Sequence, residues 1–235
     1  MEIKSEDIQI SGADGTFGGY LAAPAGQTVP GVVVIQEIFG VNVHIRSICD
    51  RLAQAGYAAL APDMFWRIRP GIQLGYTPED VAEGRGYRGE MQDDQVVEDV
   101  RAGFDALGAR PETAGKKIGL TGFCWGGMVS YLAACRLNPA ATAAFYGGGI
   151  VNYLGEADGI NAPIIFHFGE KDAGIPMDQV GQIQARAQSL PNAQVFTYPE
   201  ADHGFNCDMR GSYHAPSAAL AWQRTLDFFG QHLGG

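Results

Sequence analysis

Cys124 stands in a setting that is typical of a nucleophile. The apolar run 117–121 is followed by Gly122-Phe123-Cys124-Trp125-Gly126 and then by a helix-compatible segment. This is the Gly-x-nucleophile-x-Gly turn between a strand and a helix, with sulfur in place of oxygen. Glycines flank such a turn because side chains there would collide with neighbouring backbone. The partial positive charge at a helix N-terminus favours a thiolate, so Cys124 is predicted to be a nucleophile. The alternative is a buried structural cysteine among turn glycines.

An acid and a base follow two later apolar runs. Asp172 comes soon after 163–168, and His203 comes soon after 194–198. Open α/β sheets bind their ligands at the carboxyl ends of the strands. The chain order of nucleophile, acid and histidine is that of α/β hydrolases. We therefore predict a Cys124, His203 and Asp172 triad, in which His203 transfers the proton while Asp172 fixes the tautomer of the imidazole.

Other acids and histidines compete for these roles. Glu170 and Asp202 flank the chosen pair, but Asp172 fits the G-x-x-D turn of hydrolases better, and Asp202 is interpreted as a turn residue beside His203. His167 lies inside an apolar run, which favours a hydrogen-bonded core histidine. The remaining histidines follow no strand end: His44, His214 and His232. None has a partner at metal-ligand spacing, so no metal site is predicted.

The elements that must position the triad alternate between strand and helix. Residues 3–10 and 17–23 read as a hairpin around the turn 11–15. Short apolar runs of the buried-strand kind then recur at 31–35, 57–61, 117–121, 142–146, 163–168 and 194–198. Between them, apolar residues share helical faces: Ile45, Ile48 and Leu52; Val97, Val100, Phe104 and Leu107; Met177, Val180, Ile183, Ala187 and Leu190; Trp222, Leu226 and Phe229.

This alternation predicts one α/β domain over residues 1–235. Its central sheet is expected to be mostly parallel, with helices on both faces and an N-terminal antiparallel hairpin. The segment 64–89 is rich in Gly, Pro, Tyr and Arg and is too long for an ordinary connection. We interpret it as a lid or substrate loop.

Composition excludes several classes of function. The 235 residues carry a net charge of −10, which repels nucleic acid and anionic membranes. The four cysteines are scattered, so neither a zinc site nor a disulfide framework is indicated. The N-terminus is charged and alternating, and no apolar run is long enough to span a membrane. We expect a cytoplasmic protein, monomeric, that acts on a small molecule.

Five segments resemble the dienelactone hydrolases, also called carboxymethylenebutenolidases. They are QEIFGVN (36–42), YAALAPDMF (57–65), GFCWGG (122–127), FGEKD (168–172) and ADHGF (201–205). The resemblance runs over nearly the whole chain. It implies an α/β-hydrolase fold and a Cys-His-Asp triad that opens an enol-lactone through an acyl-thioester. It also implies that no cofactor is needed and that the enzyme serves the degradation of aromatic compounds.

The resemblance further implies a fourth catalytic residue. Glu37, the acid of the QEIFG segment, would contact the resting thiol and accept its proton when substrate arrives. Such a thiolate would be exposed to oxidation only briefly. Alternatively, Glu37 caps the helix that follows. The oxyanion of the intermediate needs two N–H donors, expected from the backbone of Trp125, after the nucleophile, and of Ile38, after an early strand.

The substrate contacts match the family less well. In well-known members, two arginines bind the substrate carboxylate. One lies in the middle loop, and the other lies shortly after the catalytic histidine. Here the fourth residue after the histidine is Cys207, a candidate to line the pocket, and the nearest arginine is Arg210. The middle loop offers Arg85 and Arg88. These three arginines are candidate substrate ligands, or else solvated surface charges.

Two further hypotheses therefore stay open. A protein without an arginine clamp would prefer simple esters or thioesters at the same site. A redox sensor on a hydrolase scaffold would use Cys124 as an oxidisable thiol and would form no acyl-enzyme.

Overall fold

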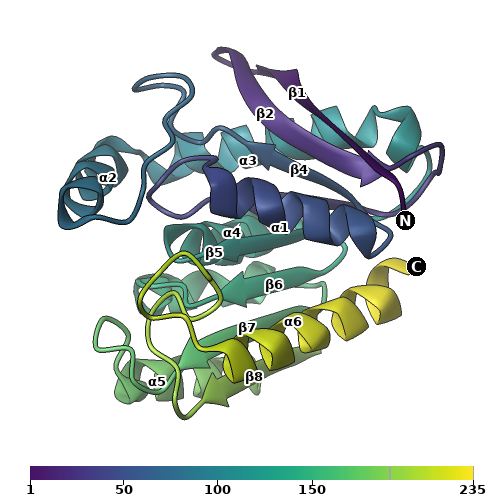
Figure 1. Cartoon of the computed structure of the whole chain (residues 1–235). Coiled ribbons are helices and arrows are strands. Elements are labelled where there is room, and N and C mark those ends of the chain that lie inside the picture. Colours follow the sequence, from purple (N-terminus) through teal and green to yellow (C-terminus); the bar gives the residue numbers. More distant parts are fainter. Residues whose placement is uncertain (191, 235) are drawn as a thin grey trace.

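The central sheet runs through the molecule with its parallel strands stacked side by side (Figure 1). The computed structural model describes residues 1–190 and 192–234, which form one eight-stranded sheet in the order β1-β2-β4-β3-β5-β6-β7-β8. The strands are β1 (Ile3–Gly12), β2 (Gly15–Pro24), β3 (Gly31–Ile35), β4 (Ala58–Pro62), β5 (Ile118–Phe123), β6 (Thr142–Phe145), β7 (Ile164–Gly169) and β8 (Ala193–Tyr198).

Helices cover both faces of the sheet (Figure 1). They are α1 (Val43–Gln54), α2 (Pro78–Glu90), α3 (Asp93–Gly108), α4 (Trp125–Leu137), α5 (Met177–Ala187) and α6 (Ala215–Phe229). Shorter helical turns span Pro111–Thr113, Ile150–Gly159 and Gly230–Gly234. In the view of Figure 1, α1 and α6 lie on the near face, and α3, α4 and α5 lie behind the sheet. Helix α2 stands apart at one end of the sheet.

The pairing of the strands confirms the predicted sheet. Strands β1 and β2 form an antiparallel hairpin, and β2 pairs antiparallel with β4. From β4 onward every neighbouring pair is parallel within the described residues. Strands β3, β4 and β6 are buried at every position because helices cover both of their faces. Continuous apolar runs are therefore what such strands require.

Helix α1 follows its sequence signals closely. Asn42 caps it, with Oδ1 accepting a hydrogen bond from the Ile45 N–H at 3.3 Å. Its apolar face, including Ile45, Ile48 and Leu52, is fully buried against the sheet. The first turn also buries His44, a polar residue that the apolar pattern does not explain.

The expectation of a loop throughout 64–89 is wrong, because α2 occupies Pro78–Glu90. Its start is well marked: Thr77 and Asp80 form a capping box, and Pro78 begins the first turn. Only Gly84 is buried in this helix. An apolar stripe is therefore missing, which is why periodicity does not reveal the helix.

The other helices agree with their predicted faces except at Met177. Met177 is the first residue of α5 and is 42% exposed, because the helix buries residues only from Val180 onward. Within the described residues, no helix is both long enough and apolar enough to cross a membrane.

Candidate active site

The turn at Cys124 is sharply strained. Cys124 has φ 57° and ψ −119°, a conformation that residues with a side chain rarely adopt. It follows β5 directly and precedes the first residue of α4. Its N–H is anchored to the Phe145 carbonyl of β6 at 3.1 Å. The backbone therefore presents the Cys124 side chain at the carboxyl end of the sheet.

The glycines around this turn are required by space. A Cβ at Gly122 would lie 2.1 Å from the Gly126 carbonyl oxygen. A Cβ at Gly126 would lie 2.4 Å from the carbonyl oxygens of both Ile35 and Gln36. Both contacts are with backbone, which cannot move aside without distorting β3 or α4. The reason inferred from sequence for these two glycines is confirmed.

Three side chains from three strand ends form one hydrogen-bonded chain. Cys124 Sγ lies 3.0 Å from His203 Nε2, and His203 Nδ1 lies 2.7 Å from Asp172 Oδ2. Asp172 is buried, and its other oxygen accepts hydrogen bonds from the N–H groups of Gly174 and Ile175 at 2.8 and 3.2 Å. The carboxylate is thus held in one orientation, and it in turn orients the imidazole.

The charges around His203 favour its protonated form. Burial alone would lower the pKa of His203, but the Cys124 sulfur and the Asp172 carboxylate outweigh it and raise that pKa to about 10. A proton taken from the thiol therefore has a stable place on this imidazole.

Glu170, Asp202 and His167, which the sequence analysis excluded from the triad, lie outside it in the structure. Asp202 is exposed and accepts the His203 N–H at 2.6 Å, as a turn residue would. Glu170 is exposed and accepts a hydrogen bond from Thr197 at 2.7 Å. His167 is fully buried between the hydroxyls of Tyr198 and Thr225, at 2.8 and 3.1 Å. Burial lowers the pKa of His167 to about 3, so it is a neutral core residue.

The two expected oxyanion donors lie on different elements. Trp125 is the first residue of α4, where an N–H has no partner inside the helix. Ile38 lies in the loop after β3, and among the described residues its N–H donates no backbone hydrogen bond. The Trp125 ring stacks on Phe65 with centroids 5.2 Å apart, and Phe65 contacts Tyr87 of α2. The 64–89 segment therefore packs against the residue that follows Cys124.

Glu37 is fully buried, and both of its oxygens are engaged. Oε1 accepts a hydrogen bond from Arg210 Nη1 at 3.0 Å, and Oε2 accepts one from the Tyr76 hydroxyl at 3.1 Å. Burial would lower the pKa of Arg210, but Glu37 and Cys124 raise it overall. The thiol of Cys124 contacts His203 in this structure, whereas Glu37 contacts Arg210 and Tyr76. Glu37 does not cap α1, a role that Asn42 fills.

Sequence reasoning missed Tyr76, Asn42 and Tyr146. Asn42 donates a hydrogen bond to the Tyr76 hydroxyl at 3.2 Å. Tyr146 follows β6 with φ 36°, is fully buried, and packs edge-on against His203 with centroids 5.3 Å apart. Asn42 could have been found as a helix cap. Tyr76 and Tyr146 have no motif that would mark them.

The three candidate arginines have different surroundings. Arg210 is largely buried and pairs with Glu37, so it is not a solvated surface charge. Arg85 is exposed and Arg88 is half-buried, both on α2. Helix α2 touches the loop after β3, since a Cβ on Gly84 would lie 2.3 Å from the Ile38 carbonyl oxygen. The helix is therefore close to the site although Arg85 points to solvent.

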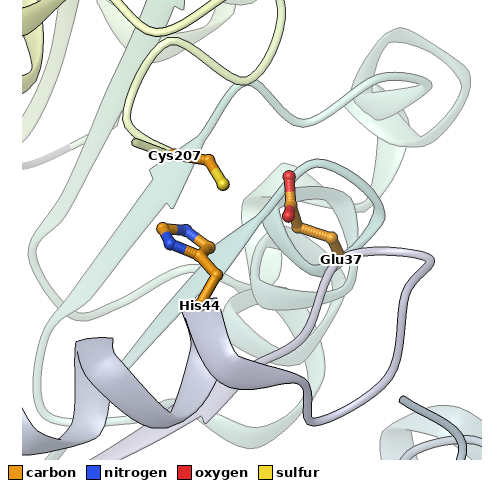
Figure 2. A group of neighbouring side chains, drawn as sticks. All are labelled: Glu37, His44 and Cys207. Atoms are coloured by element: carbon orange, nitrogen blue, oxygen red, sulfur yellow. The ribbon is translucent and has the colours of Figure 1, made fainter. Parts of the chain in front are cut away.

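One cluster near the site has the residue types of a metal centre. Glu37, His44 and Cys207 are all buried, and one potential ligand atom from each lies within 4.8 Å of the others (Figure 2). Burial lowers the pKa of His44 and, together with Glu37, raises the pKa of the Cys207 thiol to about 11. Spacing rules could not reveal this cluster, because Cys207 is far from Glu37 and His44 in the sequence.

Curated proteins resemble this chain over nearly its whole length. The protein named "Putative carboxymethylenebutenolidase" in Synechocystis sp. is 39% identical over 244 residues, which cover 99% of each chain. A protein of the same name in Azospirillum brasilense is 36% identical and covers 97% of this chain and 99% of its own.

Solved structures show the same likeness. The "Putative Dienelactone Hydrolase" of Klebsiella pneumoniae superposes with a TM-score of 0.86 at 34% identity, covering 98% of this chain and all (100%) of that one. A dienelactone hydrolase-like promiscuous phosphotriesterase from metagenomic libraries superposes with a TM-score of 0.85 at 26% identity, with 100% of both chains covered.

The family match extends over almost the whole chain. The model of the dienelactone hydrolase family matches residues 17–233, from β2 to the last helical turn. The eight-stranded sheet with its antiparallel hairpin is the α/β-hydrolase fold of the structural neighbours. The chain therefore belongs to the dienelactone hydrolase family and is a hydrolase of the type that acts on ester or lactone bonds.

Proposed function

We propose that this protein opens an enol-lactone ring of the dienelactone type, through an acyl-thioester on Cys124. The observation that supports the proposal is the continuous chain from Cys124 Sγ through His203 to Asp172, with distances of 3.0 and 2.7 Å. A thiol, a base within hydrogen-bond reach and a buried acid that orients the base are the components of nucleophilic catalysis.

The reaction then runs in two halves. His203 Nε2 takes the thiol proton, Cys124 Sγ bonds to the lactone carbonyl carbon, and the oxyanion accepts hydrogen bonds from the Trp125 and Ile38 N–H groups. Collapse of this intermediate breaks the ring C–O bond, and the leaving enolate takes the proton from His203. Water then attacks the thioester while His203 accepts its proton, and collapse releases the carboxylic acid and the thiol.

Glu37 has a place in this scheme through Arg210. The carboxylate of an anionic substrate that pairs with Arg210 would compete with Glu37 for the guanidinium. Glu37 would then be free to accept the Cys124 thiol proton in place of His203, and the leaving enolate would take that proton from Glu37. Arg210 is in this reading the substrate ligand, and Arg88 is a secondary one at the edge of α2.

The test is hydrolysis of dienelactone and of p-nitrophenyl acetate by the wild type and by Cys124→Ala. Loss of an activated nucleophile should lower kcat by about 10⁴-fold or more on both substrates. Cys135→Ala is the matched control, because Cys135 is a buried cysteine of the following helix α4. Full activity of Cys124→Ala on both substrates would exclude Cys124 as the nucleophile.

A second candidate substrate class is the simple neutral esters and thioesters. Two observations favour it: Arg210 is already paired with Glu37, and Arg85 is exposed. An arginine clamp rejects a substrate that lacks the anion, so kcat/KM for an anionic lactone and for its neutral analogue discriminates. A large preference for the anion supports the dienelactone class, and equal values support the neutral esters.

A further inference from the structure

The cluster of Glu37, His44 and Cys207 lies beside the triad but is made of other side chains. Glu37 comes from the loop after β3, His44 from the first turn of α1, and Cys207 from the segment between β8 and α6. Figure 2 shows the Cys207 sulfur directed into the space between the His44 ring and the Glu37 carboxylate. The triad uses neither His44 nor Cys207.

His44 is unusual because its imidazole is buried and, in the described part of the chain, forms no hydrogen bond. Its side chain is 1% exposed, and within the described residues neither ring nitrogen has a hydrogen-bond partner. The nearest acid is Asp208, whose oxygen lies 4.0 Å from Nδ1. A buried imidazole normally donates from one nitrogen and accepts at the other. A ring left without partners and facing a thiol and a carboxylate is arranged to bind something between them.

The three donors are those that a borderline-soft divalent cation selects. Zn²⁺ binds thiolate sulfur at about 2.3 Å, imidazole nitrogen at about 2.0–2.1 Å and carboxylate oxygen at about 2.0–2.2 Å. In a tetrahedral site such donors are about 3.3–3.8 Å apart. Here they lie within 4.8 Å of one another, so an inward shift of about 1 Å would bring them to a common ion.

Glu37 can share its carboxylate with such an ion. The carboxylate has about four acceptor directions, and the hydrogen bonds from Arg210 and Tyr76 occupy two of them. Asp208 is exposed and can swing closer to His44 Nδ1, to hold the ring in the tautomer that leaves its other nitrogen free for the metal. The Arg210 charge opposes the cation, and the Asp208 carboxylate offsets that charge.

We propose that Glu37, His44 and Cys207 form a site for one thiophilic divalent cation, with Zn²⁺ as its natural probe. Coordination requires the Cys207 thiolate, so the thiol proton passes to the buffer when the ion binds. The bound ion would coordinate a Glu37 oxygen and so weaken the hydrogen bonds that this carboxylate accepts from Arg210 and Tyr76. The site shares Glu37 with the proposed hydrolytic site, but the test of metal binding does not depend on which substrate is hydrolysed.

The test must first remove the other thiol that could bind the ion. Cys124 and His203 are themselves a sulfur–nitrogen pair 3.0 Å apart, so all measurements use the full-length Cys124→Ala protein. Zn²⁺ binding is measured by titration calorimetry, and Co²⁺ is used to detect thiolate-to-metal charge-transfer absorption. Into this background are introduced Cys207→Ser, His44→Gln and, as the matched control, Cys135→Ala.

The expected result is one Zn²⁺ per chain and a thiolate–cobalt absorption band. Cys207→Ser should abolish the band, and both Cys207→Ser and His44→Gln should weaken Zn²⁺ binding by at least about tenfold. Cys135→Ala should change neither. Circular dichroism and thermal unfolding establish that each variant is folded, and His44→Gln tests the site without touching any cysteine.

Other outcomes would overturn the proposal. These are the absence of saturable Zn²⁺ binding in the Cys124→Ala protein, a cobalt band that persists in folded Cys207→Ser, or equal loss of binding in Cys135→Ala. None of them bears on lactone hydrolysis, which the Cys124→Ala background cannot perform by the proposed mechanism.

Discussion

The two sides of the active site are held together in different ways. On the nucleophile side, Cys124, Asp172 and His203 each follow a strand of the sheet, and each is fixed by short-range backbone contacts such as the Gly174 and Ile175 N–H groups on Asp172. On the opposite side, Glu37 meets Tyr76 from 39 residues away and Arg210 from 173 residues away. We refer to the triad side, which backbone groups close in, as the rigid side, and to the Glu37 side, which side chains from distant segments hold, as the adjustable side.

The difference extends to the backbone. The nucleophile turn leaves no free space, since Gly122 and Gly126 are closed in by carbonyl oxygens. The Glu37 side is bordered by α2, whose Gly84 lies against the Ile38 carbonyl. A change on the first side should therefore destroy catalysis outright. A substitution on the Glu37 side should instead displace residues of the site and lower the activity by a smaller factor.

Asp172→Asn tests the rigid side and should have the largest effect. The amide can no longer stabilise the imidazolium of His203 and favours the wrong tautomer, so kcat should fall by about 10⁴-fold while the fold is kept. Steady-state hydrolysis of p-nitrophenyl acetate measures it. Glu170→Gln is the control, because Glu170 is an exposed neighbour in the same turn, and it should be near wild type. Similar activities for the two variants would contradict the assignment of the acid.

Gly84→Ala tests the adjustable side. The new Cβ would lie 2.3 Å from the Ile38 carbonyl oxygen, so α2 or the loop after β3 must shift. A displacement of about 1 Å at a positioning group can cost up to about 100-fold, and we expect kcat/KM to fall by about 10- to 100-fold.

The matched control is Gly86→Ala on the same helix, where a Cβ meets nothing within 4 Å. It should leave kcat/KM unchanged and stabilise the protein by about 0.5–1 kcal/mol, because alanine favours the helix over glycine. If Gly84→Ala behaves like Gly86→Ala, the contact of α2 with the loop after β3 has no role in catalysis.

A smaller effect should appear in the pH dependence of stability. The pKa of His203 is raised to about 10 from its ordinary 6.5. Protonation of His203 in the folded state thus contributes stability that is fully present below pH 6.5 and is lost as the pH rises towards 10. The excess free energy of unfolding of the wild type over His203→Gln should decline across this range. Urea unfolding at several pH values measures it, and an excess that grows with pH would refute the ion pair of His203 with its partners.

Much of the fold could be predicted because local patterns and global packing agree. The continuous apolar runs correspond to buried strands, and the faces of α1 and α3 face the sheet, since parallel strands must be covered on both sides. Helix α2 was missed because Gly84 is the one residue that it buries and Tyr87 packs on Phe65 only half-buried, which leaves no apolar stripe in the sequence.

The sequence by itself determined the turn at Cys124, the chain order of Cys124, Asp172 and His203, and the strands that carry them. Each depends on a short segment whose glycines, apolar runs and turn residues constrain the local backbone. Only the tertiary structure decided that Arg210 belongs to Glu37, that Tyr76 reaches the same carboxylate, and that His44 and Cys207 meet beside it. Contacts between distant segments depend on how helices and loops close over the sheet, and no local pattern encodes that closure.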